Sequence, residues 1–559
     1  MVPTMTHRQP ITAVWLWSQH NEHRVPLARL LMLAMYRVWP DFRACMYLNV
    51  AMMAVLAGVL IRCAHRLRGS IVATDVFFPL VLLGLAQGLN FIWAWQVEFF
   101  ASTAIALCVL VLIAEYRETS GFGTAVLAST CLALLVVCGA HGLALVPVLT
   151  LWIVAIALLR SPAGVTGGGQ RRAVLLLLAV FVLAFGGLYF VGYQRVPYFP
   201  TSPSVRYTVK TALQFLTMAF GPAVKSWWPV SGLLTATILA GAALLLIALA
   251  WRRREERVRA VGFLLFLGAM SSLGLAIGLG RNGFEPRYIT LAVPALCCVY
   301  LISTVYMGRA AGNFVRLGLL AIVCLCFWSN TQSGLQYGRS LRKELGSFES
   351  EMRAGTPPYR LIHEHLWNLH INVQVLNDYL PLLRSANIGQ FRYLRDNPSF
   401  REISVPLTPV ELHHSSWEGH TARTTAPNAS IVFAIPQTLY VAGIRLKYTV
   451  EDKQGILPLF FFSWRTDDAT AVTRENSYWT SPTGDRANWE RGSWLRIGRP
   501  ESELLFWICD RIRKICIHPD AQPCVFKLSE LVLLVPEGNN NVRLIQPAIF
   551  QDAPELTRR

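Results

Sequence analysis

Long apolar runs recur along the first 335 residues and predict a polytopic helical membrane protein. One of them, LLTATILAGAALLLIALAW, covers residues 233–251, and the others have similar lengths. A helix needs about 20 predominantly apolar residues to cross the hydrocarbon core of a bilayer. We therefore expect spanning helices at about residues 41–61, 72–90, 98–115, 122–139, 141–160, 173–193, 230–251, 259–279, 289–306 and 314–331.

The pattern changes twice after residue 335. Residues 336–427 are more polar and predict a mostly helical linker region, whereas residues 428–540 contain runs of alternating apolar positions such as LYVAGIRLKYTV (439–450). Alternation over short runs that are separated by turn residues is typical of β-strands. We expect these strands to form a jelly-roll-like β-sandwich, followed by a tail at 541–559. Its aromatic candidates for stacking on sugar, or else for structural roles in the core, are Trp464, Tyr478, Trp479, Trp489 and Trp494.

Composition and charge agree with a membrane protein. The 559 residues are 53% hydrophobic and 15% charged, whereas about 25% of residues are charged in a soluble protein. The net charge is +18, and much of the arginine lies in short clusters between apolar runs, as in WRRREERVR (251–259). Such clusters are typical of cytoplasmic loops, and the sequence has no basic-aromatic motif for RNA or DNA. We expect a lipid bilayer and no nucleic acid among the partners.

The basic loops also predict the orientation of the chain. We expect the cytoplasmic side to contain loops 62–70, 167–172 and 251–259, and the loop with Arg309 and Arg316. Alternation then places on the outer side residues 1–40, the turns 90–97, 140–142 and 280–288, the loop 194–229 and the tail after about 332. Because residues 1–15 contain no apolar signal segment, we expect that a first spanning helix is missing from this sequence. Residues 27–39 predict an interfacial helix that begins at Pro26, with Arg29 and Arg37 reaching water.

Chemically capable residues gather in these outward segments. They are Glu22, His23 and Arg24 in the N-terminal segment, Asn90, Trp93, Gln96 and Glu98 in one turn, His141 in the next, and Arg281, Glu285, Arg287 and Tyr288 in the last. Arginine forks match phosphate oxygens, aromatic faces suit sugar rings, and a carboxylate can act as a general base. Each residue has a simpler explanation, such as a solvated loop acid or an interfacial tryptophan. The functional interpretation therefore depends on all of them lying on one side of the membrane.

The combination resembles the bacterial integral-membrane glycosyltransferases of the GT-C superfamily. The resemblance covers about residues 17–335 and lies in NEHR (21–24), NFIWAWQ (90–96), the HG turn at 141–142 and GRNGFEPRY (280–288). It implies a GT-C-like domain over 41–335 and a catalytic acid in the first outward loop, at Glu22 with His23 beside it. Members commonly have two acids there, whereas this chain has Glu-His. Whether a divalent cation, Mg²⁺ or Mn²⁺, takes part is therefore left open.

The resemblance also implies the substrates and the compartment. The donor would be a polyprenyl-phosphate sugar, with Arg24, Arg281 and Arg287 at its phosphate, and the acceptor a glycan or lipid of the cell envelope. The chain would be a multi-pass protein of the bacterial inner membrane with its C-terminal domain in the periplasm. Alternatives are a non-catalytic scaffold that presents the β-domain or binds glycans, a lipid-linked oligosaccharide ligase or polymerase, and a transporter.

Two features of the tail invite metal or redox chemistry. The segment HEH (363–365) suggests metal ligands, but no third ligand is nearby in the sequence, so we expect a polar helix there instead. Three cysteines, Cys509, Cys516 and Cys524, occur late in the chain. In an oxidising compartment two of these three could form a disulfide, and the sequence does not decide which.

Overall fold

The computed structural model describes residues 1–159, 168–194, 201–370, 373–426, 428–451, 461–466, 477–478, 502–519 and 523–537. The chain divides into two compact units. The first comprises Met1–Glu349 with Tyr379–Arg392, and the second comprises Ser350–Asp378 with Tyr393–Arg559.

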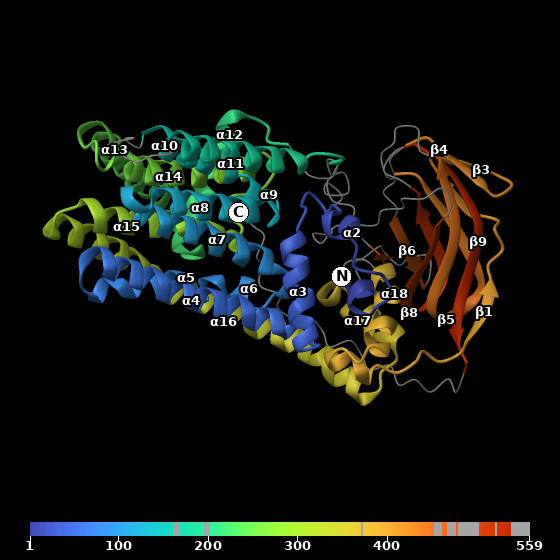
Figure 1. Ribbon diagram of the computed structural model, residues 1–559. Helices are drawn as coiled ribbons and strands as arrows, with labels where there is room; N and C mark the ends of the chain where they lie inside the picture. The colour runs from blue at the N-terminus through green and yellow to red at the C-terminus, as the bar shows by residue number, and fades with distance from the viewer. Residues whose placement is uncertain are drawn as a thin grey trace. The chain divides into compact units, whose positions relative to one another are not determined.

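The first unit is a bundle of long apolar helices (Figure 1). Nine helical segments within the described residues are long and apolar enough to cross a membrane. The longer helices are α4 (Arg43–Arg68), α7 (Val97–Ala114), α10 (Val146–Leu159), α11 (Gly168–Leu188), α13 (Val230–Arg252), α14 (Arg257–Gly278), α15 (Ile289–Tyr306) and α16 (Arg309–Ala354). The predicted span 122–139 corresponds to α8 (Gly121–Val136), an apolar helix of 16 residues. The sequence prediction of a helical, membrane-type domain is thus confirmed at this level.

Some observed helices differ from the predicted spans in continuity or in length. The span 72–90 is broken into η1 (Ala73–Val76), α5 (Phe77–Leu83), η2 (Leu85–Gln87) and α6 (Gly88–Phe91). Helix α16 begins at Arg309 but continues to Ala354, well beyond the predicted end at 331. A hydropathy pattern marks only where residues become polar, and residues 332–354 keep good helix formers after the apolar run ends.

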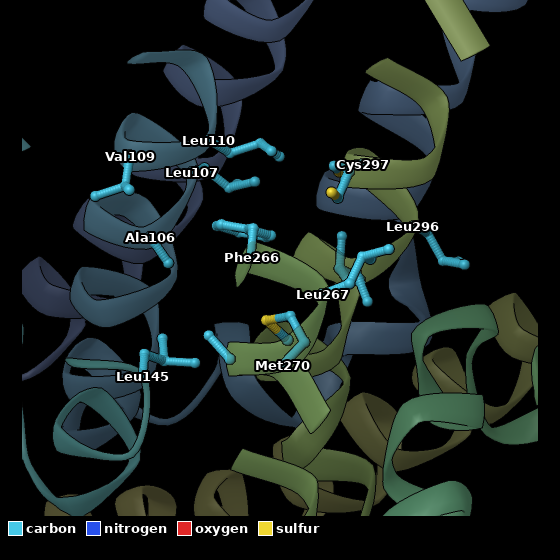
Figure 2. Close-up of a cluster of buried hydrophobic side chains, with 14 of the residues drawn as sticks. Ala106, Leu107, Val109, Leu110, Leu145, Phe266, Leu267, Met270, Leu296 and Cys297 are labelled. Carbon is cyan, nitrogen blue, oxygen red and sulfur yellow. The ribbon is translucent and has the colours of Figure 1, made fainter. Parts of the chain in front are cut away.

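The core of the bundle lies between α7, α14 and α15 (Figure 2). One buried cluster includes Phe266, Leu267 and Met270 of α14 together with Leu107 and Leu110 of α7. All five side chains are at most 7% exposed. Helix α15 is apolar nearly all around and buried along most of its length, which is expected for a helix surrounded by others. This arrangement fixes the ends of α7, α14 and α15, which carry the residues discussed below.

The charged loops 62–70, 115–123 and 251–259 meet at one end of the bundle. Arg66 pairs with Glu115 at 3.1 Å, Arg68 pairs with Asp75 at 2.7 Å, and Arg259 reaches the carbonyl of Ala114 at 3.5 Å. Loops 62–70 and 251–259, which the sequence places on one side, thus both contact the end of α7 and lie at the same end of the bundle.

The N-terminal segment folds into α1 (Val2–Met5), α2 (Ala13–Trp17) and α3 (Pro26–Val38). Pro26 is the first residue of α3, as expected. The prediction that Arg29 reaches water is wrong, because Arg29 is 6% exposed and donates to the carbonyls of Leu16 and Ser18 at 2.9 and 3.0 Å. The short helix α2 leaves its last carbonyls without intrahelical partners, and Arg29 satisfies carbonyls at this end.

Several shorter elements connect the helices. They are η3 (Ala94–Gln96), η4 (Glu118–Ser120), α9 (Ala140–Leu143), α12 (Val205–Thr217), η5 (Met218–Phe220), η6 (Pro222–Trp227), η7 (Pro286–Tyr288), α17 (Pro358–Leu369), α18 (Val373–Ser385) and η8 (Gly389–Tyr393).

The second unit is built on an antiparallel β-sheet, as the alternating pattern predicted. Its described strands are β1 (Phe400–Ser404), β2 (Glu411–His413), β3 (Ser415–Glu418), β4 (Thr421–Thr424), β5 (Ser430–Glu451), β6 (Phe461–Arg465), β7 (Ser477–Tyr478), β8 (Ser502–His518) and β9 (Val525–Pro536). The order is β3-β4-β9-β5-β8-β6-β7, with β1 also on β9 and β2 also on β5. The long strand β5 pairs with β8 and β9, and register shifts bend it after Ala434 and after Val441.

Strands begin at Phe400, earlier than the expected boundary at 428. Strands β1 to β4 are three to five residues long and polar, so alternation did not reveal them. Pairing holds β1 and β4 on β9, β2 on β5, and β3 on β4. Trp464 is 2% exposed and donates from its indole to Asp510 at 3.0 Å, which assigns it to the core and not to sugar stacking. Trp479, Trp489 and Trp494 lie outside the described residues, as does the tail 541–559. Cys509, Cys516 and Cys524 all lie within the described residues and form no disulfide with one another.

Candidate functional site

A tight turn presents the first candidate residues. The backbone N–H of His20 donates to the carbonyl of His23 at 2.7 Å, and the N–H of His23 donates back at 2.9 Å. Asn21 between them has φ +49°, a left-handed conformation that asparagine tolerates better than most residues. The turn also packs on the neighbouring outward segment, because the rings of His20 and Trp95 are 4.9 Å apart.

Arg24 fastens this turn to the end of α11. Its three guanidinium nitrogens donate to the carbonyls of Tyr189 at 2.9 Å, Trp17 at 2.7 Å and Val191 at 2.8 Å, and its backbone N–H donates to the Tyr189 hydroxyl at 3.0 Å. The side chain is buried, and these carbonyls take up its donors. We therefore assign Arg24 a positioning role in place of the phosphate-binding role expected from the sequence.

Glu22 lies between a cation and a neutral imidazole. Its Oε1 forms an ion pair with Arg281, which follows α14, and lies 3.3 Å from His23 Nε2. The backbone N–H of Ala140 donates to His23 Nδ1 at 3.3 Å, so the neutral ring carries its proton on Nε2, next to the Glu22 carboxylate. The three side chains are 19–24% exposed. Segments more than 250 residues apart thus form one partly buried charged group, as the co-location hypothesis requires.

Glu98 adds a second carboxylate beside His23. It lies in the first turn of α7 and is 6% exposed, and its Oε2 has no hydrogen-bond partner among the described residues. His141 bonds through Nε2 to the Glu98 carbonyl at 3.2 Å and meets the ring of His23 edge-on, with centroids 5.7 Å apart. Within the described part of the chain, His141 Nδ1 is also buried without a partner. Buried polar atoms of this kind are uncommon and mark a place where a polar group is accommodated.

Arg287 is held in place through its backbone. Asn90 donates to the Arg287 carbonyl at 2.9 Å and to the Thr290 hydroxyl at 2.7 Å, and Thr290 donates to Gln87 at 2.6 Å. The Arg287 guanidinium lies over the ring of Tyr288, 5.4 Å from its centroid, and its Nε–H is buried without a described acceptor. Asn90 is therefore a positioning residue: it holds the backbone of Arg287 and does not bind its guanidinium group.

The remaining expected residues lie around this group. Burial lowers the pKa of Lys225, whereas the nearby Glu285 carboxylate raises it. The same carboxylate also interacts electrostatically with Arg281. Gln96 is buried and Trp93 is 50% exposed. The sequence missed Gln87, Thr290 and Lys225, because each is a single polar residue inside an apolar stretch or a long loop.

Protonation of His23 opposes the fold. Burial lowers its pKa from the ordinary 6.5, nearby Arg287 lowers it further, and Glu98 acts in the opposite direction. The unfolded chain therefore binds this proton more readily, so its contribution to stability is complete above about pH 6.5 and declines as the pH falls below that value. We expect the unfolding temperature of the detergent-purified chain to fall less between pH 7.5 and pH 5.5 in His23→Asn than in wild type. The matched control is His7→Asn, at an exposed histidine of the same segment, which should keep the wild-type slope. Equal slopes in all three proteins would contradict the prediction.

Comparison of the chain with protein-family models, with curated proteins and with solved structures finds no match in any of the three. The class of the protein is therefore described by its own fold and site. It is a protein with helices of membrane-spanning length and a partly buried cluster of acidic, histidine and arginine side chains at one end of them.

Proposed function

We propose that the chain is a membrane glycosyltransferase that moves a sugar from a polyprenyl-phosphate donor to a glycan or lipid acceptor of the cell envelope. The observation that carries the proposal is the ion pair of Glu22 with Arg281, with His23 on the same carboxylate oxygen. Ionisable groups within membrane-spanning segments are costly and tend to mark function, and Glu98 beside His23 lies in the first turn of α7. A carboxylate between an imidazole and arginines suits a reaction in which a hydroxyl loses a proton while a phosphate departs.

The reaction needs one base and one anion site. The acceptor hydroxyl gives its proton to the Glu22 carboxylate, and its oxygen forms a bond to the anomeric carbon. The bond from that carbon to the phosphate oxygen breaks, and the lipid phosphate leaves with the electron pair, which inverts the configuration. Arg281 and Arg287 stabilise the charge that develops on the phosphate. When Arg281 turns to the phosphate, Glu22 keeps the Nε2–H of His23 and becomes the base.

A divalent cation does not fit the residues around Glu22. Among the described residues, the group of carboxylates and histidines at this turn does not bring three ligand atoms within reach of one ion, and Arg281 already neutralises Glu22. We therefore derive no step through Mg²⁺ or Mn²⁺.

An apolar cavity supports a lipid-linked donor. It has a volume of about 450 Å³ and lies between α13, α14 and α15, where it is lined by Leu239, Ala240, Ala243, Leu264, Leu265, Leu267, Gly268, Met270, Ser271 and Ala295. Small residues such as Ala240, Ala243 and Gly268 leave this space, and its apolar lining suits a hydrocarbon chain. Helix α14, which forms one wall, ends at Gly278 and leads directly to Arg281. A prenyl chain in the cavity would therefore leave its phosphate on the side of the arginines.

Filling the cavity should weaken binding of long-chain donors. Ala243 lines the space from α13, so we expect Ala243→Phe to raise KM for a long polyprenyl-phosphate sugar by about tenfold, the effect of about two buried methylene groups. The value of kcat and the KM for a short-chain donor should change little. Leu244→Phe is the matched control, because the neighbouring Leu244 is 68% exposed. Equal effects of Ala243→Phe on short and long donors would remove the cavity from the binding site.

The proposal also assigns a side of the membrane to the site and to the β-sheet unit. With the basic loops in the cytoplasm, the site faces the periplasm of a bacterial inner membrane, and so does the second unit. We infer that its sheet is a jelly-roll-like sandwich that accompanies the transferase domain.

Mass spectrometry of envelope glycans from a deletion strain tests the proposed function. The strain is complemented with wild type or with Glu22→Gln at matched membrane levels. A sugar that wild type restores and Glu22→Gln does not would support transfer at this site and would give the mass of the sugar. If neither protein changes any glycan or glycolipid, the chain is better explained as a scaffold that presents the β-domain. If the restored unit is a whole oligosaccharide, the chain is a ligase or polymerase.

A further inference from the structure

The segment His363–His365 has the third ligand that the sequence did not supply. Glu364 and His365 lie in α17, and Glu351 lies in the last turn of α16, which a short turn connects to α17. His365 Nε2 is 2.9 Å from Glu351 Oε2. One ligand atom from each residue lies within 4.8 Å of the other two.

We propose that Glu351, Glu364 and His365 form a binding site for a divalent cation of the zinc type. All three belong to the second unit, so the site is separate from the Glu22 cluster and does not depend on the proposed function.

The charges at this place favour a cation. Glu351 and Glu364 bring two carboxylates close together, and the guanidinium of Arg360 pairs with Glu364 at 3.2 Å. The imidazole of His365, which is 7% exposed, lies directly against the Glu351 carboxylate. A divalent ion between them would bind both carboxylates and the imidazole at once, while Arg360 turns to solvent.

The ligand set selects the kind of ion. Imidazole nitrogen with carboxylate oxygens suits Zn²⁺ and similar transition metals, whereas Ca²⁺ and Mg²⁺ prefer oxygen ligands alone. Ligands of one Zn²⁺ lie about 2.0–2.2 Å from it, so two of them are at most about 4.4 Å apart. The observed spread closes with small rotations of the side chains. Glu364 is on the exposed side, which leaves room for water as a fourth ligand.

His363 is excluded from the site by its own contact. Its Nδ1 is 2.8 Å from the carbonyl of Trp507 in β8, so it packs α17 on the sheet. The ion would connect the last turn of α16 to α17 from the other side. Its expected effect is therefore structural, and it should appear as stabilisation of the second unit.

Metal content and affinity of the tag-free full chain test the proposal. The detergent-purified protein is treated with a chelator, reloaded with Zn²⁺, desalted and analysed by mass spectrometry for bound zinc, and Zn²⁺ affinity is measured by calorimetry. We expect one zinc per chain in wild type. His365→Gln and Glu351→Gln should weaken binding by more than about tenfold, since even residues that only support a ligand have effects of that size. Glu364→Gln, at an exposed position that endangers the fold least, should weaken it as well.

Controls separate this site from adventitious surface binding. His413→Gln removes an exposed histidine that also lies near a glutamate, with His413 Nε2 3.7 Å from Glu411, and should keep one zinc per chain. Loading with Co²⁺ should give visible d–d bands in wild type that are lost in Glu364→Gln and His365→Gln. No zinc in wild type, or the same zinc content and affinity in all the Glu351, Glu364 and His365 variants, would overturn the proposal. Equal binding of Ca²⁺ and Zn²⁺ would also overturn it, because the imidazole would then take no part.

Discussion

Glu22→Gln is expected to lower the rate of sugar transfer by about 10²–10⁴-fold, the usual contribution of a positioned general base. The amide keeps the shape of the side chain but cannot accept the proton of the acceptor hydroxyl. It also removes the charge that pairs with Arg281 and accepts from His23. The measurement is the rate of lipid-phosphate release from a polyprenyl-phosphate sugar by the purified chain.

Two further variants make this result interpretable. Glu118→Gln changes an exposed carboxylate of η4 at the opposite end of the bundle and should leave the rate unchanged. Glu98→Gln tests the second carboxylate beside His23. Wild-type rates in Glu22→Gln together with a large loss in Glu98→Gln would transfer the role of base to Glu98. A wild-type rate in both would contradict the assignment of the catalytic site to this cluster.

Arg287→Ala is expected to reduce kcat/KM for the donor by about 10²–10³-fold, similar to the loss of one preorganised donor at a developing negative charge. Its backbone is fixed by Asn90, so truncation of the side chain should remove the guanidinium without moving the turn. Arg287→Lys should recover only part of the rate, because an ammonium group cannot bind two phosphate oxygens as a fork does.

Arg206→Ala is the control for general charge loss, since Arg206 is exposed on α12. The rates are compared at equal ionic strength, because attraction of an anionic lipid headgroup is screened by salt. An equal rate in Arg287→Ala and wild type would show that this guanidinium does not bind the departing phosphate.

Helix positions were predictable because each long apolar helix corresponds to an apolar run in its own segment of the sequence. The run at 233–251 is apolar whatever surrounds it, and α13 is found at Val230–Arg252. Helix α16 shows the limit of that signal: its apolar run ends near residue 331, but the helix continues to Ala354. The short strands β1, β2 and β4 gave no local signal, because their pairing partners are in β5 and β9.

The candidate site was predictable as a set of residues but not as a set of roles. Topology alone grouped Glu22, Glu98, His141, Arg281 and Arg287 on one side, and the structure links Glu22 to Arg281 and relates Glu98 and Arg287 to His23. Arginines that look alike in the sequence have different functions in the structure. Arg24 and Arg29 bind backbone carbonyls, whereas Arg281 pairs with Glu22, and only the positions of distant carbonyls distinguish them.

The sequence by itself determined the class of fold, because hydrophobic runs and alternation are local properties. A long apolar run favours a helix of membrane-spanning length, and alternation favours a strand with one buried face. It also determined which polar segments share a side, because loops alternate across the helices. The tertiary structure decided which residues touch. It paired residue 22 with residue 281, gave His23 its tautomer through Ala140, and brought Glu351 to His365. Each of these contacts depends on how distant helices pack, and helix packing is set by side-chain shape over the whole core, which no short segment encodes.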